Sequence, residues 1–436
     1  MPGPYPTQLH MLVGTYTHLS SATSHSKGVY LYSVDIANAT ARQLHCAQVP
    51  NPSFLSIQGS NVYALSEMGT HSQLHSIALH VPAASQQQGQ VPTASQQQGQ
   101  VATMAGQQAS IQGQVPAASQ QQGQVASIVG QQAPLQGHVP AASQQQGQVA
   151  AMASQQASIQ GQVPAAAVAG VHELTLTATI PSPGDDPCHL MAVGDKLYTA
   201  CYSSGSVAVI QLNSDGTLGE TKQQFHFTQH GSHPRQQASH LHNLALSPCG
   251  TYLVASNLGG DCLHLFKRHK SGLLSPLQTV STPAESGPRH MQWDNSGTHL
   301  YLITELSDEV MVFTFEQERL NHVQTINAAR TPSHGAGDIH IHPSGKWLYA
   351  SARLIDDGIA LFSIPADDAP ITRTAFFPTG KHPRNFAITP CGTMLLCACS
   401  HKKAIEFYSI APDDGSLTYL EGHDIPIDYP VCLVLF

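Results

Sequence analysis

A glycine-marked repeat of about 47 residues constrains the fold of this chain more than any other feature. The glycines that close four short turns are spaced by 47, 48 and 47 residues: Gly250, Gly297, Gly345 and Gly392. One apolar alternating run precedes each turn, two more follow it, and a polar turn then leads into a fourth run. Four short strands repeated at this spacing are typical of the blades of a β-propeller.

Two weaker copies of the repeat precede these four, one on each side of residues 81–168. Their equivalent positions, Ser53 and Cys188, are 135 residues apart, and removing the 88 residues of 81–168 leaves 47. Three N-terminal runs lack an inner strand, and the C-terminal run "YPVCLVLF" lacks a blade. Pairing of the two chain ends would complete a seventh blade and remove an open sheet edge. We therefore predict an all-β, seven-bladed propeller of four-stranded blades over residues 8–436, closed by its N- and C-terminal strands.

Residues 81–168 differ from the rest of the chain in composition. The unit "VPAASQQQGQ" occurs three times, and the segment contains no Asp, Glu, Lys, Arg or aromatic residue. Such a segment cannot bury enough apolar surface to offset the entropy of ordering it, so we expect a disordered low-complexity insertion within one blade. A tolerated surface insertion is favoured over a working part, because loop-closure entropy grows slowly with length.

Charge and composition exclude several classes of partner. The chain has 18 Lys and Arg against 27 Asp and Glu, and its formal net charge of −9 argues against nucleic-acid binding. No apolar run is long enough for a transmembrane helix, and the N-terminus does not resemble a signal peptide, so no membrane partner is expected. Nine scattered cysteines without a C-x2-C spacing favour reduced thiols over a disulfide framework or a zinc site. We therefore expect a cytoplasmic protein that acts as a monomer.

Two columns of residues should surround one mouth of the central channel, where propellers commonly bind ligands. They are the residues that begin the inner strands and those that end the antiparallel second strands. The first column comprises Ser53, Cys188, His242, Arg289, Gly337, Arg384 and Val431, and the second Tyr16, Glu67, Tyr202, Asn257, Glu305, Arg353 and Ser400. Arginines at this mouth suit carboxylate or phosphate binding, and its glutamates and histidine suit proton transfer. The alternative interpretation is a rim of ion pairs without chemistry.

At these positions the sequence resembles the seven-bladed lactonase propellers. This family is typified by cycloisomerase-2-type 6-phosphogluconolactonase and includes fungal carboxy-muconate lactonizing enzyme. The matching segments lie on both sides of the insertion and include "VGTYT", "HLHNLALSPCGTYLVASNLGGD", "GPRHMQWDNSGTHLYLITE" and "DIHIHPSGKWLYASAR". The Gln-rich insertion and the turns "SPCG", "DNSG" and "TPCG" depart from the family pattern.

The resemblance implies hydrolysis of a small anionic sugar lactone, 6-phosphogluconolactone of the pentose phosphate pathway, without a metal or cofactor. By motif it implies catalytic roles for His242, Arg289, Glu305 and Arg353. We assign substrate binding to Glu67, His189, Asn257 and Arg384, which lie in or beside the two columns.

Several alternatives stay open at the level of sequence. Either His242 or Glu305 would serve as the base that activates water. A muconate-type lactonizing enzyme (a cycloisomerase) would use the same residue types, and a non-catalytic propeller would use its mouth or its insertion to bind protein. The motifs "HLH" at 240–242 and "HIH" at 340–342 suggest a four-histidine metal site, but His342 falls in a turn away from the mouth, which disfavours it.

Overall fold

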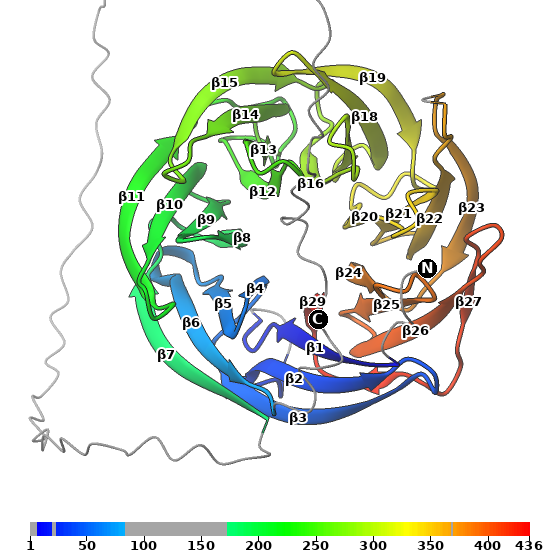
Figure 1. Cartoon of the computed structure of the whole chain (residues 1–436). Coiled ribbons are helices and arrows are strands. Elements are labelled where there is room, and N and C mark those ends of the chain that lie inside the picture. The colour runs from blue at the N-terminus through cyan, green and yellow to red at the C-terminus, as the bar shows by residue number, and fades with distance from the viewer. Residues whose placement is uncertain (1–6, 20–22, 83–171, 368) are drawn as a thin grey trace, which may run out of the picture. The chain divides into compact units, whose positions relative to one another are not determined.

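The computed structural model describes residues 7–19, 23–82, 172–367 and 369–436. Seven antiparallel sheets are arranged around a central axis in this part of the chain (Figure 1). The prediction of an all-β, seven-bladed propeller is therefore confirmed. Except for Val81 and Pro82, the segment predicted to be disordered lies outside the described residues. None of the described helices is long and apolar enough to span a membrane.

We number the blades I to VII and give the strands of each from the axis outward. Blade I comprises β4 (Leu55–Gln58), β5 (Asn61–Ser66), β6 (Gln73–His80) and β7 (Glu173–Pro181). Blade II comprises β8 (Pro187–Val193), β9 (Lys196–Cys201), β10 (Ser206–Leu212) and β11 (Leu218–His226). Blade III comprises β12 (Leu241–Leu246), β13 (Tyr252–Asn257), β14 (Cys262–Arg268) and β15 (Leu274–Ser281).

The remaining blades follow the same order. Blade IV comprises β16 (Pro288–Trp293), β17 (His299–Thr304), β18 (Glu309–Glu316) and β19 (Arg319–Asn327). Blade V comprises β20 (Ile339–Ile341), β21 (Trp347–Ala352), β22 (Gly358–Ser363) and β23 (Thr372–Pro378). Blade VI comprises β24 (Pro383–Ile388), β25 (Met394–Cys399), β26 (Ala404–Ile410) and β27 (Leu417–Tyr419), with β28 (Ile425–Pro426) also paired to β26. Blade VII comprises β29 (Pro430–Leu435), β1 (Gln8–Thr15), β2 (Gly28–Asp35) and β3 (Thr40–Gln48).

Blade VII closes the ring, because the C-terminal strand β29 pairs with the N-terminal strand β1. This arrangement confirms the predicted closure and leaves no gap in the ring of sheets (Figure 1). In blade I, β6 pairs with β7 in a register that ends at His80 opposite Glu173. The chain therefore leaves blade I after its third strand and returns to form its fourth.

Neighbouring blades pack face to face through buried apolar side chains. Between blades V and VI, for example, Tyr349, Phe386 and Leu395 belong to one buried cluster. Each such side chain stabilises the fold by roughly 1.5–3 kcal/mol when it leaves water. The outer strands face water on one side, and their burial alternates accordingly, as in β7 and β19. The core therefore lies between the blades and leaves the polar residues of the inner strands free to line the axis.

The repeated glycines occupy the turns that join first to second strands in blades III to VI. Gly250, Gly297, Gly345 and Gly392 have φ values of 71°, 73°, 74° and 72°, in the left-handed region that favours glycine. The amide of Gly250 donates to the Ser247 carbonyl oxygen at 2.8 Å, which closes the turn. These turns lie at the end of the axis where the inner strands finish. We call the opposite end, where the inner strands begin, the site face.

A one-residue irregularity recurs at the start of five inner strands. In blade III, for example, Leu241 pairs with Asn257 and Asn243 with Ser256, so His242 has no partner residue on β13. The residues skipped in this way are Cys188, His242, Arg289, Arg384 and Val431. A bulge of this kind re-aims the side chain of the extra residue. Five members of the first predicted column are therefore bulge residues at the site face.

Candidate active site

The carboxylate of Glu305, which follows β17, lies among cationic side chains at the site face. Its Oε2 atom is 2.8 Å from Arg289 Nε, and its Oε1 atom is 3.4 Å from Arg353 Nη2. A third arginine, Arg235, places Nη2 2.8 Å from Oε1. His242 Nε2 is 3.9 Å from Oε2. The structure thus brings all four predicted catalytic residues together, and we call these five residues the Glu305 cluster.

The two deepest arginines of the cluster are fixed by backbone carbonyl groups that precede β20. Arg353 donates from Nε to the Gly335 carbonyl oxygen at 2.6 Å and from Nη2 to that of Ala336 at 2.9 Å. Arg289 donates from Nη1 to the Gly337 carbonyl oxygen. Each guanidinium group is therefore oriented by blade V as well as by Glu305. Preorganised donors of this kind stabilise developing negative charge without rearranging during a reaction.

Glu305 is an anion at neutral pH. Burial alone would raise the pKa of its carboxyl group, but the Arg353, Arg289 and Arg235 guanidinium groups outweigh burial and hold this pKa well below its usual range. Burial, together with repulsion from Arg289, lowers the pKa of Arg353 to about 9, which still leaves it protonated at neutral pH. A carboxylate with such a low pKa is a weak base, so Glu305 is better suited to binding cations than to accepting a proton.

His242 is the neutral base of the cluster. Burial, the Arg289 cation and His290 lower the pKa of its imidazole well below its usual range. Among the described residues, its Nδ1 atom is buried and has no hydrogen-bond partner. A buried polar atom without a hydrogen bond costs roughly 1–3 kcal/mol of stability. A ligand or water that bonds to this atom would remove that cost. His242 therefore offers one free ring nitrogen, Nδ1, while its Nε2 faces Glu305.

A second group of side chains links blades VI, VII and I at the same face. Arg384 donates from Nη2 to the Tyr16 hydroxyl at 2.8 Å and lies over its ring at 5.3 Å. The Tyr16 hydroxyl donates in turn to Glu67 Oε2 at 2.9 Å. The predicted substrate-binding residues Glu67 and Arg384 thus belong to one chain of contacts. Arg384 is bonded to a hydroxyl group, whereas Arg289 is bonded directly to the Glu305 carboxylate.

A polar layer lies one residue further along the inner strands. His290 Nδ1 is 2.7 Å from Asp338 Oδ1, and His340 Nε2 is 2.9 Å from Oδ2 of the same carboxylate. Burial and the Arg289 cation lower the pKa of His290 to about 4, and its ring lies 5.3 Å from that of His242. His189, predicted to bind substrate, belongs to this layer and packs against Phe54 at 4.2 Å. His189 therefore lies further along the axis than the Glu305 cluster and is not part of it.

Asn257 does not join the cluster, although it was predicted to bind substrate. Its side-chain oxygen accepts from the amides of His240 and Gly260, both at 3.0 Å, and its nitrogen donates to Ser239 Oγ at 3.1 Å. These bonds tie the end of β13 to the connection that precedes β12. The strand position was predicted correctly, but the amide is occupied by backbone and serves the local fold.

The two His-x-His motifs do not converge on a metal site. His242 faces Glu305, whereas His340 is paired with Asp338. His342 donates from Nε2 to the carbonyl oxygen of Gly392 at 2.8 Å, at the far end of the axis. Within the ranges that the structure describes, no three His, Cys, Asp or Glu side chains are grouped to hold a metal ion.

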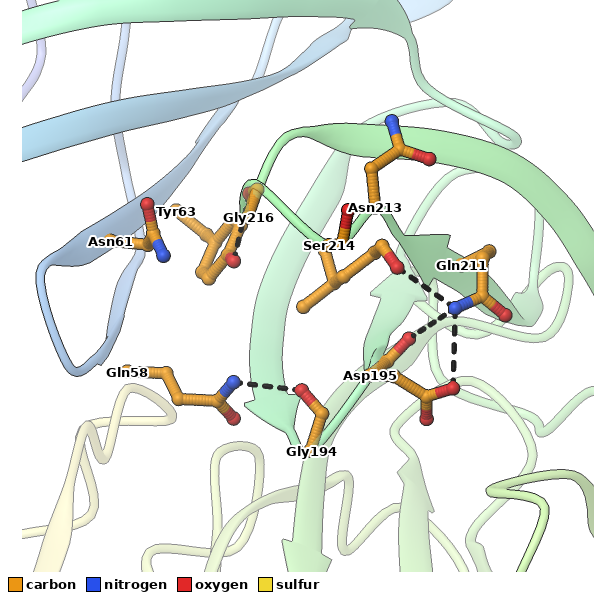
Figure 2. Close-up of a pocket in the computed structure, with 10 residues that line it drawn as sticks. Gln58, Asn61, Tyr63, Gly194, Asp195, Gln211, Asn213, Ser214 and Gly216 are labelled. Atoms are coloured by element: carbon orange, nitrogen blue, oxygen red, sulfur yellow. Dashed lines mark hydrogen bonds between the residues drawn. The ribbon is translucent and has the colours of Figure 1, made fainter.

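A cavity of about 460 Å³ lies elsewhere, between blades I and II at the end opposite the site face (Figure 2). Its lining includes the amide side chains of Gln58 and Gln211, both of which have hydrogen-bond partners. Gln58 Nε2 donates to the Gly194 carbonyl oxygen at 2.7 Å, and Gln211 Nε2 donates to the backbone oxygen of Asp195 at 3.0 Å. This cavity is separate from the Glu305 cluster and lacks its cations.

The fold and the cluster together define a β-propeller with a buried, arginine-rich site at one end of its axis. The chain belongs to the family "Lactonase, 7-bladed beta-propeller", whose model matches residues 10–150 and 140–435.

Curated relatives and solved structures agree with this family. A 6-phosphogluconolactonase of Formosa agariphila is 32% identical over 248 residues, which cover 54% of this chain and 70% of the relative. A 6-phosphogluconolactonase of Bacillus subtilis is 29% identical over 259 residues, 57% of this chain and 73% of the relative. A crystal structure from Bacteroides uniformis, described as a candidate 6-phosphogluconolactonase, is 30% identical with a TM-score of 0.75 and covers 99% of this chain and 100% of that one.

Proposed function

We propose that this protein hydrolyses 6-phosphogluconolactone to 6-phosphogluconate. The observation that carries the proposal is the neutral His242 imidazole beside a carboxylate that three arginines hold in its charged form. This arrangement provides a base, fixed positive charge for an oxyanion, and cations for an acidic substrate. The names of the curated relatives support the same reaction.

In the proposed reaction, His242 accepts a proton from water while the water oxygen bonds to the lactone carbonyl carbon. The carbonyl oxygen becomes an oxyanion, which Arg289 or Arg353 stabilises. The ring C–O bond then breaks, and His242 returns the proton to the leaving alkoxide, which gives a hydroxy acid. Glu305, 3.9 Å from Nε2, stabilises the transient imidazolium. The structure thus favours His242 over Glu305 as the base.

We further propose that the protein acts in the cytoplasm, as a monomer, and that its product enters the pentose phosphate pathway. The nine cysteines are all free thiols, which supports a reducing compartment.

A substrate panel with the wild-type protein tests the proposal. We expect turnover of 6-phosphogluconolactone well above its spontaneous hydrolysis, and no lactonization of carboxylated muconates. Turnover of the muconates alone would instead show a cycloisomerase, whose carboxylate substrate the same arginines would bind. No turnover of any substrate would favour a non-catalytic binding propeller.

A further inference from the structure

One arginine of the Glu305 cluster comes from outside the repeat. Arg235 lies in the connection between β11 and β12, residues 227–240. This connection is not part of the repeat, so Arg235 has no equivalent position in the other blades. This inference rests on the proposed function: we propose that Arg235 gives up its contact with Glu305 and binds the phosphate group of the substrate instead. Arg235 would then be the residue that distinguishes phosphorylated from unphosphorylated sugar lactones.

The connection that carries Arg235 is held in place by hydrogen bonds. The next residue, Gln236, is fully buried and donates from Nε2 to the Leu258 carbonyl oxygen at 2.8 Å and to Asp261 Oδ1 at 2.7 Å. The amide of Gly231 donates to the Gln236 carbonyl oxygen at 2.9 Å, which closes the loop. The backbone at Arg235 is therefore anchored to blade III, and its side chain is aimed at the cluster from a fixed position.

The exposure of Arg235 sets it apart from the other arginines around Glu305. Its side chain is 43% exposed, against 2% for Arg289 and 4% for Arg353. The buried pair bonds to carbonyl groups of blade V, whereas Arg235 contacts Glu305 and the Tyr202 hydroxyl. Arg235 can therefore turn to a ligand without disturbing the buried network, and Glu305 keeps two guanidinium partners when it does.

The charge balance of the site face calls for a further anion. The guanidinium groups of Arg235, Arg289, Arg353 and Arg384 face three carboxylates: Glu305, Glu67 and Asp338, which acts on Arg289 from the layer of His290 and His340. Four cations against three anions leave positive charge in excess. A phosphate monoester carries about −1.5 to −2 charges at pH 7 and accepts both N–H groups of an arginine fork. It would match the excess positive charge, whereas an uncharged lactone would leave it unmatched.

Kinetics on two lactones test the inference with Arg235→Gln. We expect the ratio of kcat/KM for 6-phosphogluconolactone to kcat/KM for gluconolactone to fall about 10- to 100-fold, the loss of one charge-assisted bond. Arg235→Lys, which keeps the charge without the fork, should fall between wild type and Arg235→Gln on the phosphorylated substrate. The matched control is Arg319→Gln, which removes an exposed arginine at the opposite end of the axis and should change neither rate.

Calorimetric binding of 6-phosphogluconate and gluconate provides a readout that does not need turnover. Wild type should bind 6-phosphogluconate more tightly than gluconate, and Arg235→Gln should lose most of this preference. An equal loss for both ligands, or no loss, would overturn the inference. If the wild type turned over no lactone but still showed this preference, the proposed reaction would fail while the phosphate site stood.

Discussion

Replacing Glu305 by Gln tests the electrostatic account of the site in one step. The substitution keeps the shape of the side chain and removes its charge. It leaves Arg289 and Arg353 buried without a carboxylate, together with the half-exposed Arg235. Removing one partner of a buried ion pair typically costs 3–5 kcal/mol, since the remaining charge is uncompensated. We expect the free energy of unfolding to fall by about that amount.

Urea unfolding and thermal melting measure this loss. One kcal/mol shifts the melting temperature by about 2–4 °C in domains of 150–250 residues and by less in larger ones, so a drop of about 5 °C is expected. Inorganic phosphate at 100 times its Kd should restore about 2.7 kcal/mol to the variant by mass action. The matched control is Glu318→Gln, an exposed carboxylate paired with Lys267, which should barely change the midpoint.

The pH dependence of the same loss provides a further check. The pKa of Glu305 is lowered in the folded state, so its contribution is fully present above its unfolded value of about 4.5 and is lost as pH falls through the folded value. The difference between wild type and Glu305→Gln should therefore persist from pH 8 to pH 5. A Glu305→Gln variant as stable as wild type at pH 7 would refute this account of the cluster.

Three further predictions concern the base, the insertion and the turns. With gluconolactone, which avoids ionisation of phosphate, kcat/KM should stay constant above pH 6.5 and fall only at lower pH, because the pKa of His242 is lowered; a midpoint above 6.5 would contradict its assignment. Replacing residues 81–172 by Asn-Gly should keep turnover within about 2-fold, since His80 already pairs with Glu173 and this dipeptide favours a two-residue hairpin; lost activity in a folded variant would show a working insertion. Gly250→Ala should lower stability in urea by roughly 1–2 kcal/mol, because φ is 71° there while no atom crowds the new Cβ; an unchanged midpoint would show that the turn relaxes.

The blades could be predicted from the sequence because their turn glycines recur about every 47 residues. Gly250 and its three equivalents occupy turns that need a positive φ, so the glycines recur where the backbone requires them. The same period placed His242, Arg289 and Glu305 on one face, which the contacts around Glu305 confirm.

The rest of the site could not be predicted, for physical reasons. Arg235 lies in a connection that does not repeat, so periodicity carried no signal for it. Asn257 occupies the expected strand end, but its amide bonds to backbone, and a column position does not reveal which bonds a side chain makes. The sequence does not predict the bulges of the inner strands either, because an extra residue is defined only by the register with the neighbouring strand.

The initial rate of 6-phosphogluconolactone hydrolysis by wild type and His242→Ala tests the central claim most directly. His322→Ala, which removes an exposed histidine on the outer strand β19, is the matched control. The account predicts a loss of about 10²–10⁴-fold in His242→Ala, the usual contribution of a general base, with His322→Ala at the wild-type rate. Equal rates in all three folded proteins would contradict it.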